Sequence, residues 1–352
     1  MSGLLLLVLV AVGMLAGAEG AGEPTVQTVT GTAPDTAPPT TTGPSIRRVL
    51  WGAATAPAPE HHATESREEE ARYLEARIGR KFDMTRHYLP GPSVSWAGDA
   101  DMAATVASGR IPAFSFRAGS WTWRQIASGA ADGALRARFN ELLDAGNSLW
   151  RHAIIGFENE PEDEADEKGS PADYRAAVDH IVGLARSMGL PNNWTTWLMV
   201  STWDSGRTSA YAESWVPRSV DYLGVHGYGT PAHADTPERC TTVVREWRSF
   251  VQYFASPHDS AVALGKRMII GEIAQREDFL TPGPDRKADW IRSIPAGLIR
   301  LPRIDAVLWW HSGGGEGPFP GGCDYQHSFR LDSTARSLRA YAEAGRASIF
   351  GR

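Results

Sequence analysis

The sequence predicts an α/β fold, a (β/α)8 or TIM barrel. From about residue 46 onward, short β-branched or aromatic runs alternate with longer segments of helical period, and eight such units follow one another in a chain of 352 residues. That number of units in that length is typical of the barrel. A doubly wound open sheet is the alternative, but residues 52–55 (GAAT) lack the glycine pattern of a nucleotide-binding turn.

Each unit pairs one expected strand with one expected helix. The strands are expected at residues 48–52, 82–86, 111–116, 153–159, 197–202, 222–226, 267–272 and 304–310. The helices are expected at residues 65–78, 100–107, 134–145, 171–188, 210–215, 237–255, 285–299 and 333–344. The fourth helix has the clearest ends, because Ser170 suits an N-cap, Pro171 suits the first helical position, and Gly189 follows the last residue.

The segment before the barrel is expected to direct export. Residues 4–18 are an uncharged apolar run with small residues at its end, so residues 1–21 are predicted to be a secretory signal peptide. A wrongly assigned start codon and a membrane anchor are the alternatives, although a helix needs about 20 apolar residues to span a membrane. Residues 22–45 are rich in Thr and Pro and are predicted to be a linker, which leaves residues 46–352 as the barrel domain.

Composition excludes several classes of protein. The apolar share of 42% argues against a disordered chain, and two cysteines are too few for a disulfide scaffold. The net charge of -6 argues against a nucleic-acid partner. Cys240 and Cys323 could pair in an oxidising compartment, and the sequence leaves this open. The chain has 13 Trp residues, whose flat rings suit either a core or stacking on sugars.

Two carboxylates are expected where strands end, at the mouth of the barrel. Glu160 follows the fourth strand and Glu272 ends the seventh, so the two would face each other across the mouth. Hydrolysis of a glycosidic bond needs such a pair, one acid to protonate the leaving oxygen and one carboxylate to attack the anomeric carbon. Either Glu alone could instead be part of a solvated turn or an ion pair.

Motifs around these residues resemble those of a known clan. Residues 157–161 (FENEP) resemble the strand-four motif of the clan A retaining glycoside hydrolases, and residues 270–272 (IGE) resemble the strand-seven nucleophile motif. Within the clan, the chain is most similar to glycoside hydrolase family 26, the β-mannanases. Supporting stretches cover the whole barrel and lie at residues 109–112, 123–129, 159–163, 172–175 and 265–266.

The resemblance implies roles for individual residues. Glu160 is the expected acid/base, Glu272 the nucleophile, and Asn159 a substrate-binding residue where family 26 usually has His. That departure keeps a β-glucanase or β-xylanase activity open. Glu158 is the reserve candidate for the acid, because residues two apart in an extended strand share a face.

Further residues are expected to bind substrate or support the carboxylates. The expected set comprises His226 and Tyr228 at the end of strand six, Trp310 in strand eight, and Arg86 at the end of strand two. Tyr228 could instead be a core residue, Trp309 could point inward in place of Trp310, and Arg86 could belong to a structural ion pair. Four other rings are expected in segments around a glycan cleft or as anchors of helices and loops, namely Trp96, Trp121, Trp123 and Trp203.

No cofactor and no metal site is expected. His61 and His62 lack a further ligand at a recognised spacing, and His226 and His311 lack a recognised carboxylate partner pattern, so surface or supporting roles are predicted.

The carboxylate pair and the resemblance to family 26 together predict a secreted, monomeric, retaining endo-β-glycoside hydrolase. Its expected substrate is a plant-type polysaccharide, β-1,4-mannan, cleaved by double displacement with two Glu residues. A carbohydrate-binding barrel without activity is the alternative from a different class.

Overall fold

The described part of the protein lies within one of two units of the chain. The computed structural model describes residues 47–57, 63–190, 193–204, 209–228, 248–275, 286–312 and 329–351. All of them belong to the unit Ile46–Arg352, and none to the unit Met1–Ser45. The predicted signal peptide and linker therefore lie outside the described residues, as do Cys240, Cys323, His61 and His62.

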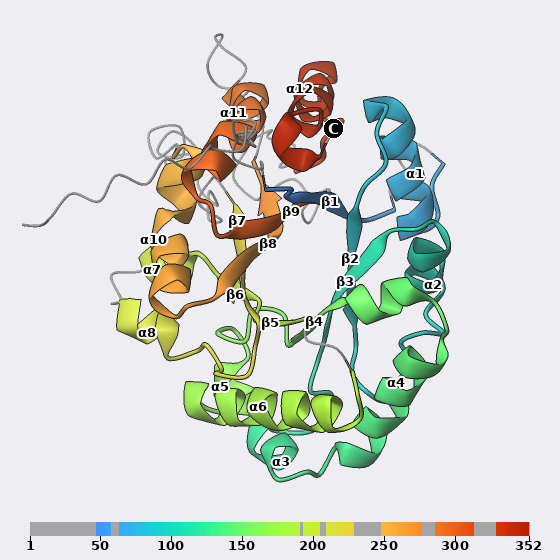
Figure 1. Cartoon of the computed structure of the whole chain (residues 1–352), viewed down its shortest axis with the longest axis vertical. Helices are drawn as coiled ribbons and strands as arrows, with labels where there is room; N and C mark the ends of the chain where they lie inside the picture. The colour runs from blue at the N-terminus through green and yellow to red at the C-terminus, as the bar shows by residue number, and fades with distance from the viewer. Residues whose placement is uncertain are drawn as a thin grey trace, which may run out of the picture. The chain divides into compact units, whose positions relative to one another are not determined.

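A closed ring of parallel strands forms the centre of this unit (Figure 1). The strands are β1 (Leu50–Thr55), β2 (Met84–Leu89), β3 (Ile111–Phe116), β4 (Ile154–Phe157), β5 (Trp194–Thr195), β6 (Leu198–Met199), β7 (Tyr222–Tyr228), β8 (Arg267–Ala274) and β9 (Ile304–His311). Pairing runs β1 to β5 in order, closes through β5 and β6 onto β7, and returns through β8 and β9 to β1. Because β5 and β6 are two pieces of one barrel strand, the predicted (β/α)8 barrel is confirmed.

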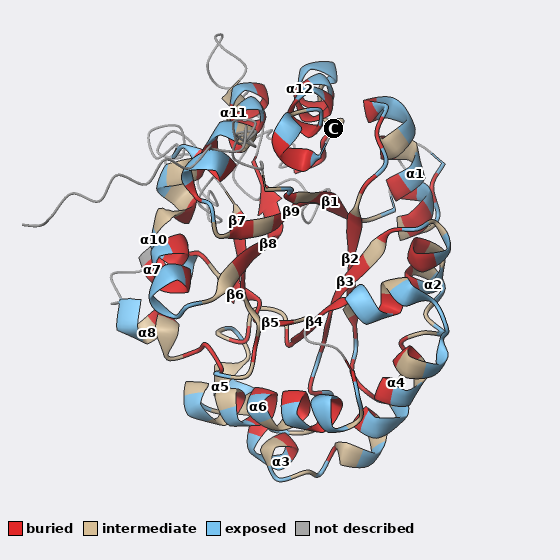
Figure 2. Ribbon diagram, viewed as in Figure 1, coloured by how far each residue is buried: buried red, intermediate tan, exposed pale blue. Residues whose placement is uncertain are grey.

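Helices surround the ring, and their outward faces are exposed while the strands are buried (Figure 2). The helices are α1 (Arg67–Ile78), α2 (Ala100–Ala107), α3 (Trp123–Ala127), α4 (Asp132–Asp144), α5 (Ala165–Lys168), α6 (Pro171–Ser187), α7 (Ser201–Asp204), α8 (Ser209–Glu213), α10 (Phe250–Ala263), α11 (Arg286–Arg300) and α12 (Ala335–Gly345). The predicted start of α6 is confirmed, since the Ser170 hydroxyl accepts the Asp173 N–H and Pro171 follows. Within the described ranges, no helix has the length and apolar character needed to span a bilayer.

Some predicted boundaries were wrong. The sixth expected helix was placed at 237–255, whereas α10 begins at Phe250, because Ser249 caps it together with Gln252; residues 229–247 are not described. The fifth strand was placed at 197–202, but the chain pairs at 194–195 and 198–199 and is helical from Ser201. Between the two pieces, the Thr196 hydroxyl donates to Gly224 O and accepts the Gly224 N–H, both at 3.1 Å, so a side chain replaces a ladder bond.

The barrel interior holds a small core of its own, separate from the larger core between strands and helices. Its buried members are Met84, Ala113, Ile154, Trp197, Ile269, Ala306 and Leu308. Trp197 is the largest of them, and it fits because three strands place glycine beside it. A Cβ on Gly156, Gly224 or Gly271 would lie far inside van der Waals contact with the indole of Trp197.

We expect Gly156→Ala to destabilise the barrel by about 1–3 kcal/mol, because the added methyl group would overlap the indole of Trp197 in a close-packed interior. Urea-induced unfolding measures the change. The matched control is Gly183→Ala in α6, where nothing lies within 4 Å of the added carbon, and which should stabilise by about 0.5–1 kcal/mol. Equal stability of the two variants would contradict this account of the core.

Candidate active site

The turn after β4 carries Glu160 to the carboxyl ends of the strands. The strand ends at Phe157, and both Glu158 and Glu160 have a φ of 59°, in the left-handed region that side chains other than glycine rarely adopt. Backbone bonds hold this turn on both sides, from Glu158 N to Phe116 O at 2.8 Å and from Glu160 N to Trp197 O at 3.0 Å. Strain of this kind concentrates at functional sites.

Glu158 and Glu160 do not belong to one extended strand, so the shared face that made Glu158 a reserve candidate for the acid was wrongly predicted. Because of the left-handed residues, the alternation of an extended strand does not continue past Phe157. The Glu158 carboxylate is buried, and its Oε1 accepts the Ala118 N–H at 2.9 Å and the Trp123 indole N–H at 3.2 Å. Burial raises the pKa of Glu158, and these two hydrogen bonds partly oppose the rise. The side chain thus anchors the turn to the loop after β3.

Glu272 points into the barrel because β8 is irregular. Ile269 and Gly271 face inward, so a regular strand would turn Glu272 outward. The register with β7 shifts between Val225 and His226, and Glu272 pairs with His226 directly. Such bulges re-aim side chains, and this one brings Glu272 to the same face as Gly271.

Two phenols and a guanidinium surround the buried Glu272 carboxylate. The Tyr88 hydroxyl donates to Oε1 at 2.7 Å, and the Tyr228 hydroxyl donates to Oε2. Burial raises the pKa of both tyrosines well above their usual value, so both remain protonated donors. The Arg86 Nε lies 3.5 Å from Oε1. Tyr228 and Arg86 therefore lie beside Glu272, as the sequence predicted.

Sequence reasoning missed Tyr88. The second strand was expected to end at residue 86, whereas β2 continues to Leu89. Residues two apart in a strand point the same way, so Tyr88 joins Arg86 inside the barrel. That spacing was the available signal, since Arg86 was already a candidate and Tyr88 follows it by two positions.

Arg86 joins the two halves of the site. Its side chain is completely buried, its Nη2 donates to Asn159 Oδ1 at 2.7 Å, and its guanidinium carbon lies 3.6 Å from the centre of the Trp197 ring. The position of Asn159 beside Glu160 is thus tied to the group beside Glu272. Arg86 lies within β2, not at its end as predicted.

His226 lies between the two carboxylates. Its Nδ1 is 3.0 Å from Glu160 Oε1, and its Nε2 is 3.5 Å from Glu272 Oε1. Burial lowers the pKa of His226 to about 3; the charge of Arg86 acts in the same direction and that of Glu272 opposes it. The imidazole is therefore neutral near pH 7 and adds no positive charge to the site.

Glu160 and Glu272 lie close enough to act on one bond. A carboxylate oxygen of each, together with a His226 nitrogen, falls within a set of atoms no more than 4.8 Å apart. Burial raises the pKa of Glu160, although the charges of Arg86 and Arg117 lower it in part. This set could hold a cation, but the oxygens of Glu272 already accept hydrogen bonds from two phenols. The arrangement suits a proton donor beside a nucleophile.

The tryptophans separate into core and site. Trp309 is buried, and its indole donates to Phe329 O at 2.7 Å, whereas the partly exposed Trp310 lies edge-on to Tyr88 with ring centres 5.7 Å apart. Trp310 is therefore the ring on the side of the site. Of the four rings expected around a cleft or as anchors, only Trp121 is partly exposed, and the buried ones are Trp96, Trp123 and Trp203.

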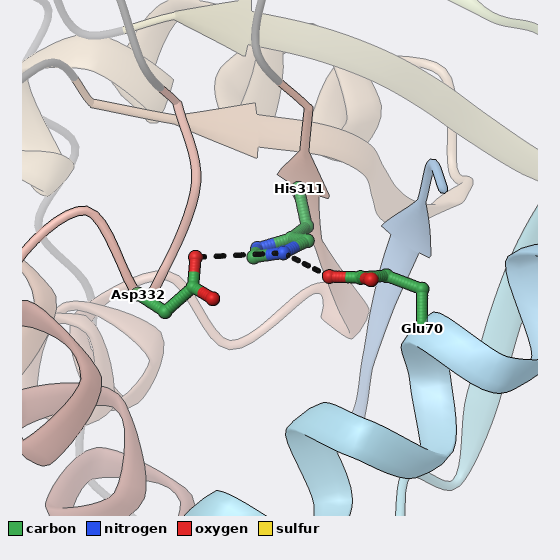
Figure 3. A group of neighbouring side chains, drawn as sticks. All are labelled: Glu70, His311 and Asp332. Carbon is green, nitrogen blue, oxygen red and sulfur yellow. Dashed lines mark hydrogen bonds and ion pairs between the residues drawn. The ribbon is translucent and has the colours of Figure 1, made fainter. Parts of the chain in front are cut away.

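A second group of titratable side chains lies beside the end of β9 (Figure 3). His311 Nε2 lies 2.7 Å from Glu70 Oε1 and 3.8 Å from Asp332 Oδ1. Its Nδ1 accepts the Leu331 N–H at 2.9 Å, so both ring nitrogens are used. Arg330 also donates to Glu70 Oε1, at 2.8 Å. The group is an ion-pair network that ties α1 to the segment before α12. His311 was predicted to have either a surface or a supporting role, and it is fully buried.

Comparison with solved structures places the chain among (β/α)8 barrels. An endo-β-1,4-mannanase from Thermotoga petrophila is 12% identical, with 88% of this chain and 78% of that chain covered and a TM-score of 0.52. A triple mutant of an endo-β-1,4-glucanase from Xanthomonas axonopodis pv. citri is 14% identical, with 85% and 100% covered and a TM-score of 0.52. The glycoside hydrolase family 26 domain of an endo-β-mannanase/endo-β-glucanase from Prevotella bryantii is 11% identical, with 86% and 90% covered and a TM-score of 0.50.

At these identities the likeness shows the fold, which agrees with the family resemblance of the sequence motifs. No family model matches the sequence. No curated protein matches it either. The chemistry of this chain must therefore be argued from the side chains at the mouth of its own barrel.

We expect the contribution of Glu70 to stability to depend on pH. Burial disfavours its charge, but hydrogen bonds from His311 and Thr64 and the charge of Arg330 lower the pKa of Glu70 from 4.5 to about 2. Because the folded value lies below the unfolded one, the contribution, about 3 kcal/mol, is complete above pH 4.5 and is lost as the pH falls toward 2.

Unfolding by urea between pH 2 and 7 checks this, with Glu70→Gln compared with the wild type. The loss in free energy of unfolding of Glu70→Gln relative to the wild type should be largest near neutral pH and should shrink below pH 4.5. Glu343→Gln, which removes the exposed ion pair with Arg292, is the control and should show no comparable pH-dependent deficit. A deficit for Glu70→Gln that is constant with pH would disprove the assignment.

Proposed function

We propose that this protein is a retaining endo-β-glycoside hydrolase that cleaves β-1,4-mannan. The approach of Glu160 to Glu272 within 4.8 Å at the mouth of the barrel carries the proposal. Retaining glycosidases place their two carboxyl groups about 5–5.5 Å apart, whereas inverting enzymes leave about 6.5–9.5 Å for a water molecule between them. An approach of one oxygen of Glu160 and one of Glu272 to within 4.8 Å suits the retaining arrangement, in which one carboxylate attacks directly.

In the first step, Glu272 attacks the anomeric carbon while Glu160 gives its proton to the leaving oxygen. The C–O bond to the leaving sugar breaks, and a covalent glycosyl–enzyme ester forms on Glu272. The raised pKa of Glu160 suits the donor, because a buried carboxyl keeps its proton at a higher pH. Tyr88 and Tyr228 orient the attacking carboxylate.

In the second step, Glu160, now ionised, takes a proton from water, and the resulting nucleophile attacks the same carbon and releases Glu272. The Glu160 side chain is 21% exposed and that of Glu272 only 3%, so Glu160 is the one that water and the leaving group can reach. A neutral His226 suits the first step, because a positive charge there would favour the ionised form of Glu160 and oppose its role as proton donor.

Mannan as the substrate is supported by the resemblance to family 26 and by the mannanases among the structural neighbours. Asn159 and Trp310 are proposed to contact the sugar at the cleavage site, Asn159 through its amide and Trp310 through its ring face. We further propose that the enzyme is secreted after removal of residues 1–21 and acts as a monomer without a cofactor.

A β-glucanase is the second candidate. The residue before Glu160 is Asn rather than the His that is usual in family 26, and a β-1,4-glucanase is among the structural neighbours. The Asn before Glu160 leaves a β-xylanase open in the same way. A binding barrel without turnover is disfavoured, because both carboxylates and their hydrogen-bonding partners are in place.

Digestion of a panel of polysaccharides tests the proposal. Incubation with mannan, xylan, mixed-linkage glucan and β-1,3-glucan should release reducing oligosaccharides from mannan, and NMR should show the β-anomer of the new reducing end first. Glu272→Gln should abolish this release, and Glu160→Gln should lower kcat/KM by about 10²–10⁴-fold. Glu167→Gln, an exposed change in the short helix α5 after β4, should leave it unchanged.

Unchanged sugar release by Glu272→Gln would overturn the assignment of the nucleophile, and early formation of the α-anomer would overturn retention. Cleavage of glucan or xylan without cleavage of mannan would establish the corresponding alternative. If the wild type cleaves none of the four at any pH, the binding barrel replaces the enzyme.

We expect Arg117→Gln to move the alkaline limb of the kcat/KM profile to higher pH. The charge of Arg117 lowers the pKa of Glu160, and activity requires protonated Glu160, so removal of that charge extends activity upward. The shift should be less than about one pH unit, because Arg117 is largely exposed and screened. Arg124→Gln, an exposed change after the same strand, should leave the limb in place. A downward shift for Arg117→Gln would contradict the role of Glu160 as the acid.

A further inference from the structure

The indole of Trp197 lies at the centre of the barrel, directly behind the candidate site. It is fully buried between β5 and β6, where the barrel strand is interrupted. Glycines on β4, β7 and β8 leave the space that it fills, at Gly156, Gly224 and Gly271. A residue that three strands accommodate in this way has little freedom to move, because packed interiors leave few voids.

Three parts of the site rest on this one residue. The Arg86 guanidinium lies over the indole, 3.6 Å from the ring centre, and the His226 imidazole is stacked on it with centres 5.5 Å apart and planes 22° apart. The Trp197 carbonyl accepts the Glu160 N–H at 3.0 Å. Arg86 in turn contacts Glu272 and Asn159. His226 contacts both Glu160 and Glu272.

We propose that Trp197 is a positioning residue, which holds Arg86, His226 and the Glu160 backbone in one fixed arrangement behind the reacting sugar. This inference rests on the proposed function. Trp197 acts through its ring face and shape, since its indole N–H has no hydrogen-bond partner among the described residues. Arg86 in particular is a buried cation whose guanidinium plane needs such a surface.

Trp194 provides a matched control. It lies three residues earlier, is equally buried, and its indole N–H likewise has no partner within the described ranges. Its ring, however, points outward and lies edge-on to Phe139 of α4, with centres 6.0 Å apart. Trp194→Phe and Trp197→Phe therefore remove the same atoms from the outer core and from the barrel interior.

We expect Trp197→Phe to lower kcat on mannan at least about tenfold relative to Trp194→Phe, with KM within about twofold, because small displacements of catalytic groups cost rate more than binding. Thermal unfolding of both variants measures the general cost of truncating a buried ring. Trp197→Leu, which keeps no aromatic face, should be slower than Trp197→Phe. Equal kcat values for Trp197→Phe and Trp194→Phe at comparable unfolding temperatures would overturn the proposal.

NMR of the His226 imidazole supplies a readout that does not depend on activity. Glu160, Glu272 and Arg86 are the charged groups that face His226, and none of them is altered in either variant. The wild type and Trp194→Phe should show neutral His226 down to about pH 3, whereas Trp197→Phe should titrate at a higher pH as water enters behind the ring. An unchanged titration in Trp197→Phe would overturn the proposal.

The two readouts separate the inference from the proposed function. If the wild type cleaves no polysaccharide, the proposed function fails, and the NMR titration still tests whether Trp197 controls the surroundings of His226. If the wild type cleaves mannan and Trp197→Phe matches Trp194→Phe in both readouts, only the positioning role fails.

Discussion

The packing of Arg86 on the indole of Trp197 is the contact on which the other features of the site depend. A buried guanidinium costs free energy unless its charge is compensated, and here an aromatic face and the Glu272 carboxylate lie beside it. Its Nη2 donates to the Asn159 amide oxygen, whereas Nε and Nη1 have no hydrogen-bond partner among the described residues. One buried guanidinium therefore lies against Glu272 and also against Asn159, the neighbour of Glu160. Glycine at one position of each of β4, β7 and β8 is the structural condition for this arrangement.

Local departures from regular strand geometry aim the two carboxylates. A shift in register between β7 and β8 turns Glu272 inward beside His226. Left-handed residues after β4 carry Glu160 past the end of its strand and send Glu158 into the outer layer, where it anchors the turn. The left-handed turn follows the end of β4, and the register shift lies toward the carboxyl-terminal halves of β7 and β8, on the side of the barrel that carries the candidate site. Regular strands would have left the two groups facing different layers.

The motifs on strands four, six and seven located most of the candidate site, because side-chain identity at a strand end is visible in sequence. Tyr88 was missed for a physical reason. The end of β2 is set by its pairing with β3, and no local signal at residue 86 distinguishes an ending strand from one that continues. Four tryptophans were expected either around a cleft or as anchors of helices and loops, and Trp96 and Trp123 pack in the core, since a large ring near a strand end can turn either way.

The sequence by itself determined the alternation of strands and helices, the helix ends at Ser170 and Gly189, and the pair of carboxylates, because these follow from local period, capping chemistry and residue type. Only the tertiary structure decided that β5 and β6 are two pieces of one strand, that Glu158 turns away from Glu160, and that Trp197 stands behind both carboxylates. Those features depend on pairing between strands and on the space that distant glycines leave, and neither is encoded in any one segment of the chain.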